Sequence, residues 1–428
     1  MSEKTDNTVG RREFIGAAAA ASASAMIIKP RLVWGTEANS AVRLGLLGCG
    51  GRGTGVTSSF LEHTGAVVTA IGDIFEAQLP RAKERLDKVA AKFDKPAVES
   101  MYSGPKAYEE LFNSKDVDAV YIATPPYFHP GHLEAAIAAG KHTYLEKPVG
   151  VDVPACLKVA ELGKKADGQM SLAVGFQIRH ASAYVEMVKR IHEGQMGEPV
   201  TGLVNYFASA LNRPETPDAT PAERRLRNWV WDRVLSGDII VEQNIHVIDV
   251  TNWVLDGHPV SVTAAGGRAG RLDDGDCWSH FNAVYTYPND VHISFASTQF
   301  GSSAWGVKMQ YSGTDGVAEA NYSSPVRIDG KNPWEAPGIG QPEDVSQQDA
   351  VTGHFAGALD DADPNKQKAF IESITSGKYI NETQQGAESA LTAIMGREAA
   401  YTGEKMTWDE LLKSDEVYDP KMDFGQFS

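Results

Sequence analysis

The sequence has few cysteines, no clusters of positive charge and no long apolar run. Its three cysteines, Cys49, Cys156 and Cys277, are too few for a disulfide framework among 428 residues, and no pair has metal-ligand spacing. The 40 Lys and Arg residues stand against 56 Asp and Glu, a formal net charge of -16. Nucleic acid and anionic membranes would require clustered cations, so neither is expected as a main partner. A neutral small molecule is the expected ligand.

The remaining composition is that of a soluble globular enzyme, with 42% hydrophobic and 22% charged residues and no internal repeat or low-complexity tract after residue 40. A chain of this length exceeds one ordinary hydrophobic core, which predicts two domains. We place them at residues 41–165 and 166–428, preceded by a separate segment at residues 1–40.

Residues 1–40 are typical of a twin-arginine export signal. Arg11-Arg12-Glu13-Phe14 precedes a run from Ile15 to Ile28 that is made mostly of Ala, Gly and Ser. The alternative is a short membrane anchor, but the run falls short of the roughly 20 residues that a spanning helix needs. Several small-residue triplets offer cleavage points. We therefore expect periplasmic export through the twin-arginine translocase, a route that carries folded proteins and any cofactor already bound to them.

A nucleotide-binding pattern begins directly after this segment. The apolar run Val42 to Gly48 predicts a buried parallel strand, and it continues into Gly48-Cys49-Gly50-Gly51-Arg52-Gly53. Glycines in such a turn let backbone N–H groups approach a pyrophosphate at a helix N-terminus. A second predicted strand, Ala66 to Gly72, ends on Asp73, whose carboxylate can accept hydrogen bonds from ribose hydroxyls. Strand, glycine loop and acid together predict a dinucleotide site.

Asp73 also bears on the choice of dinucleotide. Its negative charge would repel a 2′-phosphate, which favours NAD over NADP. Arg52 and Arg81 could soften this preference, so NADP stays possible.

Further strands at Val117 to Thr124 and His142 to Leu145 flank an Ala-rich helix at 131–140, an alternation that predicts a doubly wound parallel sheet. Ligands of such sheets lie at the carboxyl ends of the strands. We therefore expect two segments to line the cofactor cleft. The segment after the first of these strands contributes Thr124, Pro125 and His129. The segment after the second contributes Glu146, Lys147 and Pro148.

After about residue 165 the pattern predicts an α+β domain with an open, largely antiparallel sheet. The expected strands are 171–177, 200–208, 260–266, 279–287 and 291–299. Residues 324–364, rich in Pro, Gly and Asp, predict a long surface loop, and residues 383–401 a C-terminal helix. A helical stretch at 236–249 places Glu242, His246 and Asp249 on one face.

Other polar and aromatic residues of this domain have open interpretations. Glu242, His246, His280 and His292 do not form a recognised ligand set, so no metal is expected. The segment with Arg227, Trp229, Trp231 and Asp232 could reach the cofactor or offer aromatic faces to a sugar ring, and it could equally serve packing. As substrate contacts we select Arg179, Tyr206, Trp229 and Asp249.

Taken together, these motifs resemble the Gfo/Idh/MocA oxidoreductases over about residues 42–267. The Ala139-Gly140-Lys141-His142 string followed by Glu146-Lys147-Pro148 is the most specific part. The other matching positions are the Gly48 loop with Asp73, residues 122–126 with His129, residues 174–176 with Arg179, the glycines and acids of 193–198, and His246. The export signal is similar to that of exported members of the glucose-fructose oxidoreductase type.

The resemblance implies a mechanism. Members bind a sugar or polyol between the nicotinamide and the second domain. In this chain Lys147 would then hydrogen-bond the reacting hydroxyl, and His246 would accept its proton. Family members often form oligomers through the open sheet, so a homo-oligomer is expected. The family usually has Asp four residues before the histidine and Gly two before it, and here Glu242 and Asn244 occupy those positions. Glu242 could orient His246, contact substrate or face away.

Three functions follow from this pattern. The first is an NAD(P)-dependent oxidoreductase that transfers hydride between the nicotinamide and a hydroxyl of a sugar, glycoside or polyol, with Lys147, His246 and Glu242 as catalytic candidates. The second is an NAD-dependent glycoside hydrolase that works by transient oxidation, elimination and re-reduction. The third is a non-catalytic sugar sensor, which loss of Lys147 and His246 would have indicated, but both are present.

Overall fold

A computed structural model describes residues 41–211, 216–271, 273, 275–301, 306–322, 325–339 and 357–427. The predicted export signal at residues 1–40 lies outside these ranges. Within them, no helix combines the length and the apolar character that crossing a membrane requires. All three cysteines are buried and carry free thiols.

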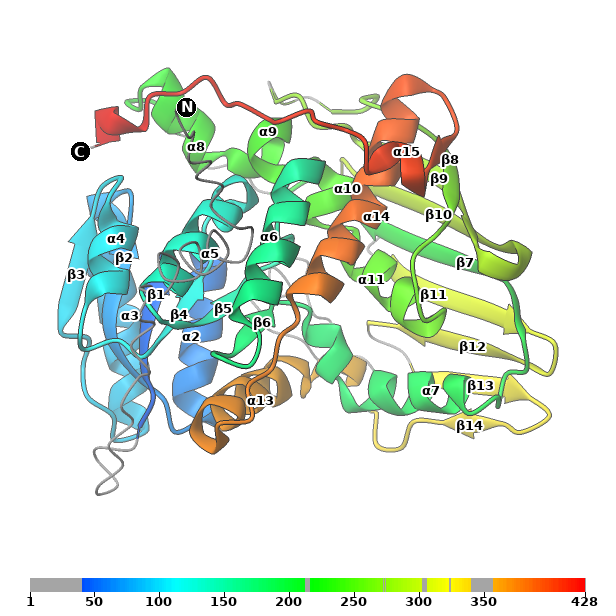
Figure 1. The fold of residues 1–428 in the computed structure, drawn as a ribbon, viewed down its shortest axis with the longest axis horizontal. Coiled ribbons are helices and arrows are strands. Elements are labelled where there is room, and N and C mark those ends of the chain that lie inside the picture. Colours follow the sequence, from blue (N-terminus) through cyan, green and yellow to red (C-terminus); the bar gives the residue numbers. More distant parts are fainter. Residues whose placement is uncertain are drawn as a thin grey trace, which may run out of the picture. The chain divides into compact units, whose positions relative to one another are not determined.

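A six-stranded sheet forms the first part of the chain, with every strand pair parallel (Figure 1). Its order is β3-β2-β1-β4-β5-β6, the arrangement of a Rossmann domain. The strands are β1 (Arg43–Leu47), β2 (Val67–Asp73), β3 (Ser100–Ser103), β4 (Ala119–Ile122), β5 (His142–Leu145) and β6 (Leu172–Val174). The intervening helices are α2 (Gly51–His63), α3 (Leu79–Lys92), α4 (Ala107–Asn113), α5 (His129–Ala138) and α6 (Val153–Ala166). The predicted doubly wound parallel sheet is confirmed.

The last strand of this sheet corrects one prediction. The segment predicted at 171–177 belongs to the first sheet and not to the second, because β6 pairs in parallel with β5. Its three residues are all buried, as expected for a strand covered on both faces. An apolar run this short contains no periodicity that would assign it to either sheet.

A second, nine-stranded sheet follows in the order β14-β13-β12-β11-β7-β10-β9-β8-β15. It is mixed, since β7 and β10 are parallel while the other pairs are antiparallel. Its strands are β7 (Pro199–Ala208), β8 (Ser261–Gly267), β9 (His280–Tyr287), β10 (Val291–Gln299), β11 (Gly306–Gly313), β12 (Gly316–Asn321), β13 (Arg327–Gly330), β14 (Trp334–Glu335) and β15 (Met406–Thr407). The largely antiparallel second sheet is thus confirmed.

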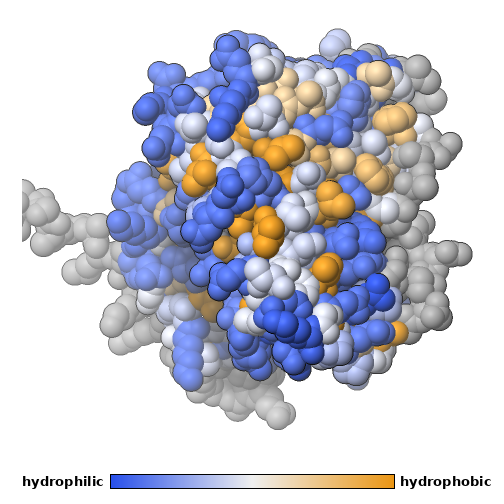
Figure 2. All heavy atoms as spheres, turned by 90° about the vertical axis from the view of Figure 1, so that its right-hand side faces the viewer, coloured by the Kyte–Doolittle hydropathy of each residue, from blue (hydrophilic) through white to orange (hydrophobic). Residues whose placement is uncertain are grey.

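One face of this sheet packs against helices, and among the described residues side chains of the other face are exposed. Val204 and Phe295, paired across β7 and β10, are buried on the inner face. Their neighbours Leu203 and Val284 point the other way and are 55% and 43% exposed. Figure 2, which views the side of the molecule where this sheet lies, shows apolar side chains gathered among hydrophilic ones.

Helices from the end of the chain join the two sheets. α14 (Thr383–Thr402) packs on α6 of the first domain and on β8 of the second sheet, and the predicted C-terminal helix is confirmed. α13 (Ala362–Ser376) packs on α2. The prediction of one loop over 324–364 is wrong at both ends, where β13, β14 and the start of α13 lie, and residues 340–356 fall outside the described residues.

The stretch predicted as one helix over 236–249 is interrupted. It contains the end of α9 (Arg233–Ser236), then α10 (Ile239–Glu242) and α11 (Ile245–Val254). The carbonyl of Ile239 accepts hydrogen bonds from both Gln243 N (3.0 Å) and Asn244 N (2.9 Å). The second of these bonds spans five residues, so the helical register breaks between Glu242 and His246. The prediction that Glu242, His246 and Asp249 share one helical face is therefore wrong.

Two glycines of the first loop have steric reasons to be glycine. Gly48 has a φ of +96°, and a Cβ there would lie 2.6 Å from the carbonyl oxygen of Ala123. Gly53, in α2, would place a Cβ 1.9 Å from the carbonyl oxygen of Gly48. The first turn of α2 therefore packs directly on the end of β1, and a methyl group cannot enter without moving backbone.

We predict that Gly53→Ala lowers the free energy of unfolding by about 1–3 kcal/mol or more, the cost typical of overpacking. Gly131→Ala is the matched control, since Gly131 is also the third residue of a helix but has open space around its Cβ position. This control should stabilise by about 0.5–1 kcal/mol. Urea unfolding followed by circular dichroism measures both, and equal effects of the two substitutions would contradict the packing argument.

Candidate active site

The loop between β1 and α2 fits the pyrophosphate of a dinucleotide. α2 begins at Gly51 with Gly50 as its N-cap, no side chain caps it, and its first turn holds no acidic residue. Backbone N–H groups at such a terminus lack helical partners and carry the positive end of the helix dipole. Gly50 has no protein atom within 4 Å of its Cβ position, so the backbone is open to close approach there.

Asp73 lies at the end of β2, beside this loop. Its carboxylate accepts hydrogen bonds from Cys49 N (2.7 Å) and Phe75 N (2.9 Å). Burial raises the pKa of Asp73, while these two amides and the Arg227 cation oppose the increase. Each oxygen still has a lone pair for a ribose hydroxyl. The residues present thus fit the adenosine side of NAD.

Arg52, the charged residue of the glycine loop, is paired with two carboxylates other than that of Asp73. Its guanidinium pairs with Glu146 Oε1 (2.9 Å) and with Asp363 Oδ2 (3.1 Å). Tyr121 donates a further hydrogen bond to Glu146 (2.8 Å). The effect of Arg52 on the NADP preference stays a prediction, since its guanidinium is engaged by these two carboxylates.

The two segments that leave β4 and β5 are tied together by His129. Its ring nitrogens lie 2.8 Å from the Thr124 carbonyl oxygen and 2.6 Å from the Pro148 carbonyl oxygen. Burial lowers the pKa of His129 to about 4, and its side chain is fully buried. The Lys147-Pro148 peptide bond that it contacts is cis.

Lys147 extends from this turn to the second domain. Its Nζ donates to the backbone carbonyl of Glu242 and to the Glu242 carboxylate (3.2 Å). Both side chains are mostly buried, at 12% and 16% exposed. A lysine ammonium has three donors, so these two contacts leave one N–H for a ligand. The structure thus directs Glu242 to the lysine.

His246 lies in the first turn of α11, with Phe176 nearby at a ring-centroid distance of 6.4 Å. Its ring is 8% exposed, and its Nδ1 is buried with no hydrogen-bond partner among the described residues. The pKa of His246 is lowered well below its ordinary value, first by burial and then by the charges of Lys147 and Arg52. The imidazole is therefore neutral at pH 7, as a proton acceptor must be.

Several other polar atoms around this point are buried and have no partner among the described residues. They belong to Gln177, Gln243 and Asn244, the last with both side-chain atoms unpaired. Gln177 is in η4 (Gln177–His180), which packs on α11. Buried polar groups are normally paired, so such a group of orphans indicates a polar ligand. No local sequence signal predicted Gln177 or Gln243 as site residues.

The residues selected as substrate contacts are placed differently. Arg179 and Asp249 form a bidentate pair (both Nε–Oδ2 and Nη2–Oδ1 at 2.9 Å), and Ser389 donates to Asp249 (2.7 Å). This pair ties η4, α11 and α14 together. Tyr206 is 5% exposed on β7, and burial, followed by the Glu242 charge, raises its pKa. A substrate role for these residues stays a prediction.

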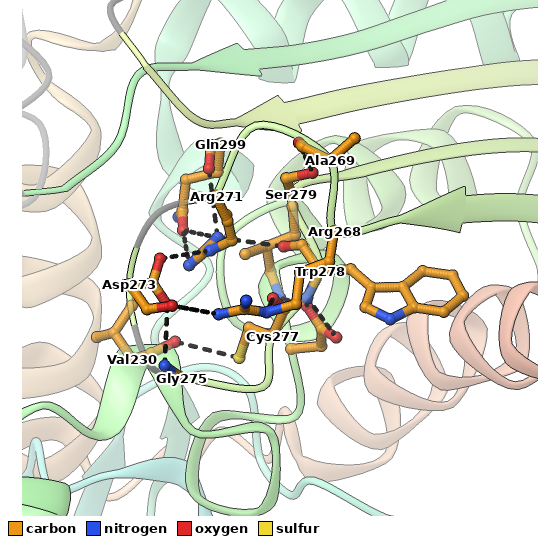
Figure 3. Close-up of polar contacts among 12 residues, drawn as sticks. Val230, Arg268, Ala269, Arg271, Asp273, Gly275, Cys277, Trp278, Ser279 and Gln299 are labelled. Carbon is orange, nitrogen blue, oxygen red and sulfur yellow. Dashed lines mark hydrogen bonds and ion pairs between the residues drawn. The ribbon is translucent and has the colours of Figure 1, made fainter.

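Trp229 lies in η5 (Trp229–Trp231), a turn held by the loop between β8 and β9. Asp273 pairs with Arg271 (3.0 Å) and Arg268 (2.8 Å), and Figure 3 shows both guanidinium groups directed to it. The Cys277 thiol contacts the Val230 carbonyl, and Asp276 N donates to the Trp231 carbonyl. This cluster fixes the position of η5.

The polar groups do not form a metal centre in the described part of the chain, where no three His, Cys, Asp or Glu side chains gather suitably. Glu242, the acidic member of the set considered from sequence, is paired with Lys147.

Comparison with known proteins agrees with this architecture. The model of an oxidoreductase family with an NAD-binding Rossmann fold, Gfo/Idh/MocA, matches residues 42–176. The model of the C-terminal domain of the same family matches residues 184–319.

Three individual proteins illustrate the similarity. An inositol 2-dehydrogenase of Rhizobium meliloti (strain 1021) is 25% identical over 356 residues, covering 82% of this chain and 94% of that protein. A glycosyl hydrolase family 109 protein of Shewanella sp. (strain ANA-3) is 36% identical over 166 residues, covering 39% and 35%. The structure of scyllo-inositol dehydrogenase from Lactobacillus casei, with NAD(H) and scyllo-inositol bound, superposes with a TM-score of 0.65 at 19% identity, covering 86% and 99%.

The two-sheet fold, with its Rossmann strand order, agrees with these matches. The chain is an oxidoreductase that uses NAD, and it belongs to the Gfo/Idh/MocA family.

Proposed function

We propose that this enzyme oxidises a hydroxyl of a sugar, glycoside or polyol with NAD as hydride acceptor. The observation that carries the proposal is the group of unpaired buried polar atoms on Gln177, Asn244 and His246, together with the Lys147 ammonium. A ligand with several hydroxyls can pair with many such atoms at once, because each hydroxyl both donates and accepts. The relatives named as inositol dehydrogenases support this substrate class.

Lys147 and His246 divide the proton chemistry. The remaining N–H of Lys147 donates to the reacting oxygen and stabilises the negative charge that develops on it. His246, neutral, accepts the hydroxyl proton. Bound NAD would accept the hydride that leaves the carbon bearing this hydroxyl. Glu242 holds the lysine in position by pairing with it, so it acts as a positioning residue.

We predict that Lys147→Met lowers kcat with a sugar or polyol by about 10²- to 10⁴-fold, the range expected for loss of a group that stabilises developing charge and positions the hydroxyl. The dissociation constant of NADH should change less than about threefold, because the lysine acts at the hydroxyl. A panel of polyols and aldoses, followed by NADH absorbance, measures the first quantity, and NADH fluorescence titration the second.

Lys164→Ala is the matched control, since Lys164 is an exposed lysine in the last turn of α6. Wild-type rates in this control and a large loss in Lys147→Met support the assignment. Full activity of Lys147→Met on the best substrate of the panel would contradict it.

The pH profile tests the proton acceptor. Burial and the Lys147 charge lower the pKa of His246, so the imidazole stays neutral below the ordinary histidine pKa of about 6.5. The acid limb of kcat/KM for oxidation should therefore lie below pH 6.5. Activity is kept as pH falls through about 6.5 and lost only at lower pH. A half-maximal point at or above pH 6.5 would rule out His246 as the acceptor in this environment.

Hydrolysis of a glycoside through transient oxidation is the second candidate, favoured by the 36% identity of residues in this chain to a family 109 glycosyl hydrolase. In that reaction the hydride returns to the sugar, so NAD is neither consumed nor gained. Release of p-nitrophenol from aryl glycosides without net NADH formation would select hydrolysis. Stoichiometric NADH formation without p-nitrophenol would select oxidation.

We propose, further, that the chain is exported through the twin-arginine translocase to the periplasm. The support is the Arg11-Arg12 sequence with the weakly apolar run behind it. Fractionation of cells that express the full chain tests this, and retention of the Arg11→Lys, Arg12→Lys variant in the cytoplasm is the expected contrast.

A homo-oligomer through the open sheet is proposed on the strength of its exposed apolar residues. Leu203, Ser294 and Val284 lie side by side across β7, β10 and β9 on that face. Leu203 and Val284 are thus exposed apolar side chains on either side of Ser294, and exposed apolar groups on one face are typical of interfaces. Light scattering coupled to size-exclusion chromatography measures the mass, and a monomer at micromolar concentration would refute the proposal.

A further inference from the structure

The last residues of the chain return from the second domain to the Rossmann domain (Figure 1). They follow α15 (Trp408–Leu411), and we name residues 418–427 the C-terminal strap. Its root is firmly attached: Tyr418 N donates to Asp152 (2.9 Å), the Arg397 guanidinium lies 4.8 Å from the Tyr418 ring centroid, and Arg225 donates to the Pro420 carbonyl. The root is therefore fixed to the protein body by charged and backbone contacts.

The tip of the strap touches two places on the Rossmann domain. Phe424 meets Phe128, which follows β4, edge to face at a centroid distance of 5.1 Å. Phe427 meets Phe75, which follows β2, in the same manner at 5.7 Å. β2 and β4 flank β1 in the sheet. A segment in contact with both exits must cross the carboxyl end of β1, where the Gly48 loop begins.

The region beneath the tip is where the adenine of a bound dinucleotide belongs. With the pyrophosphate at the glycine loop and the ribose at Asp73, the base would continue past Asp73 toward the residues that follow it. There, a pocket of about 250 Å³ opens between Phe75, Arg227 of α8 (Pro221–Arg227), Gln426 and Phe427. The Arg227 guanidinium lies over the Phe75 ring at 3.9 Å, with Glu223 holding its Nε (2.8 Å).

The chemistry of this pocket suits a flat heterocycle. Aromatic rings and the guanidinium plane stack on nucleobases, and an amide side chain can pair with ring nitrogens. Arg227 also contributes positive charge near Asp73, as its effect on the Asp73 pKa indicates. Phe75, Arg227 and Phe427 thus combine three kinds of group that recognise adenosine.

We propose that the C-terminal strap closes the adenosine end of the cofactor groove, with Arg227, Gln426 and Phe427 as contacts to the base, and that it slows the release of NAD. The proposal rests on NAD binding at the Gly48 loop and is independent of which hydroxyl compound is oxidised. The root contacts attach the strap to the protein body, and the two aromatic pairs place its tip against the Rossmann domain.

The test compares wild type with the Phe424→Ala, Phe427→Ala double variant. NADH is bound to each protein, and its dissociation is followed by stopped-flow fluorescence on mixing with excess NAD⁺. We expect the double variant to release NADH about tenfold faster or more, since two aromatic pairs are lost. It should also retain less nucleotide after purification without added cofactor. Val417→Ala, at a 67% exposed position just before the strap, is the matched control and should behave as wild type.

Fragments of the cofactor locate the effect. ADP-ribose carries the adenosine end, so its affinity should fall in the double variant, whereas nicotinamide mononucleotide should bind unchanged. Arg227→Gln should weaken ADP-ribose in the same way. Isothermal titration calorimetry measures all three proteins without any turnover, so a failure to find the sugar substrate leaves this test intact.

Two results would overturn the proposal: an NADH release rate within twofold of wild type, or equal weakening of both fragments. If the double variant unfolds at a lower temperature than wild type in the absence of nucleotide, Phe427→Leu replaces it. That substitution keeps apolar volume at the tip and removes the ring, and a release rate equal to wild type would then refute stacking by Phe427.

Discussion

The ion pair between Lys147 and Glu242 is the contact on which the proposed active site depends, because it joins the two parts of the chain there. Lys147 comes from the turn after β5, and Glu242 ends α10 of the second domain. Removing one member of a largely buried pair leaves an unpaired charge, which typically costs about 3–5 kcal/mol. The glutamate that departs from the aspartate usual at this position in the family therefore has an observed partner. It fixes the lysine and leaves one N–H of the ammonium for a ligand.

A second set of charged groups holds the residue next to that lysine. Glu146, its neighbour in the chain, forms an ion pair with Arg52 and accepts a hydrogen bond from Tyr121. Arg52 also forms an ion pair with Asp363 of α13. The arginine of the glycine loop thus connects α2 with the turn that carries Lys147. A helix from the far end of the chain, α13, completes the contact. α2, the turn that carries Lys147 and α13 are thus joined through the guanidinium of Arg52.

The sequence predicted the parts of this site that are local. The glycine loop, Asp73 and the Lys147 turn follow strand ends, where spacing alone places them at one edge of a parallel sheet. It could not predict Asp363, which lies 311 positions from Arg52 and has no local signal. The sequence also does not predict the break between α10 and α11. The break arises because two successive backbone amides, Gln243 N and Asn244 N, donate to the carbonyl of Ile239, and the side chains of the segment are compatible with a continuous helix. The short strand β6 has three buried residues and no periodicity, so its sequence does not show that it belongs to the first sheet. The sequence leaves the role of Glu242 open, and the structure pairs its carboxylate with the Lys147 ammonium.

The arrangement of carboxylates bears on the choice between oxidation and hydrolysis. Elimination of an aglycone requires an acid that protonates the leaving oxygen, in addition to a base and a hydride acceptor. Among the described residues near His246, Glu242 is committed to Lys147, and Asp249 to Arg179 and Ser389. Hydrolysis would therefore need one of these pairs to open during turnover, whereas oxidation of a hydroxyl uses Lys147 and His246 as they stand. On this ground the geometry favours oxidation.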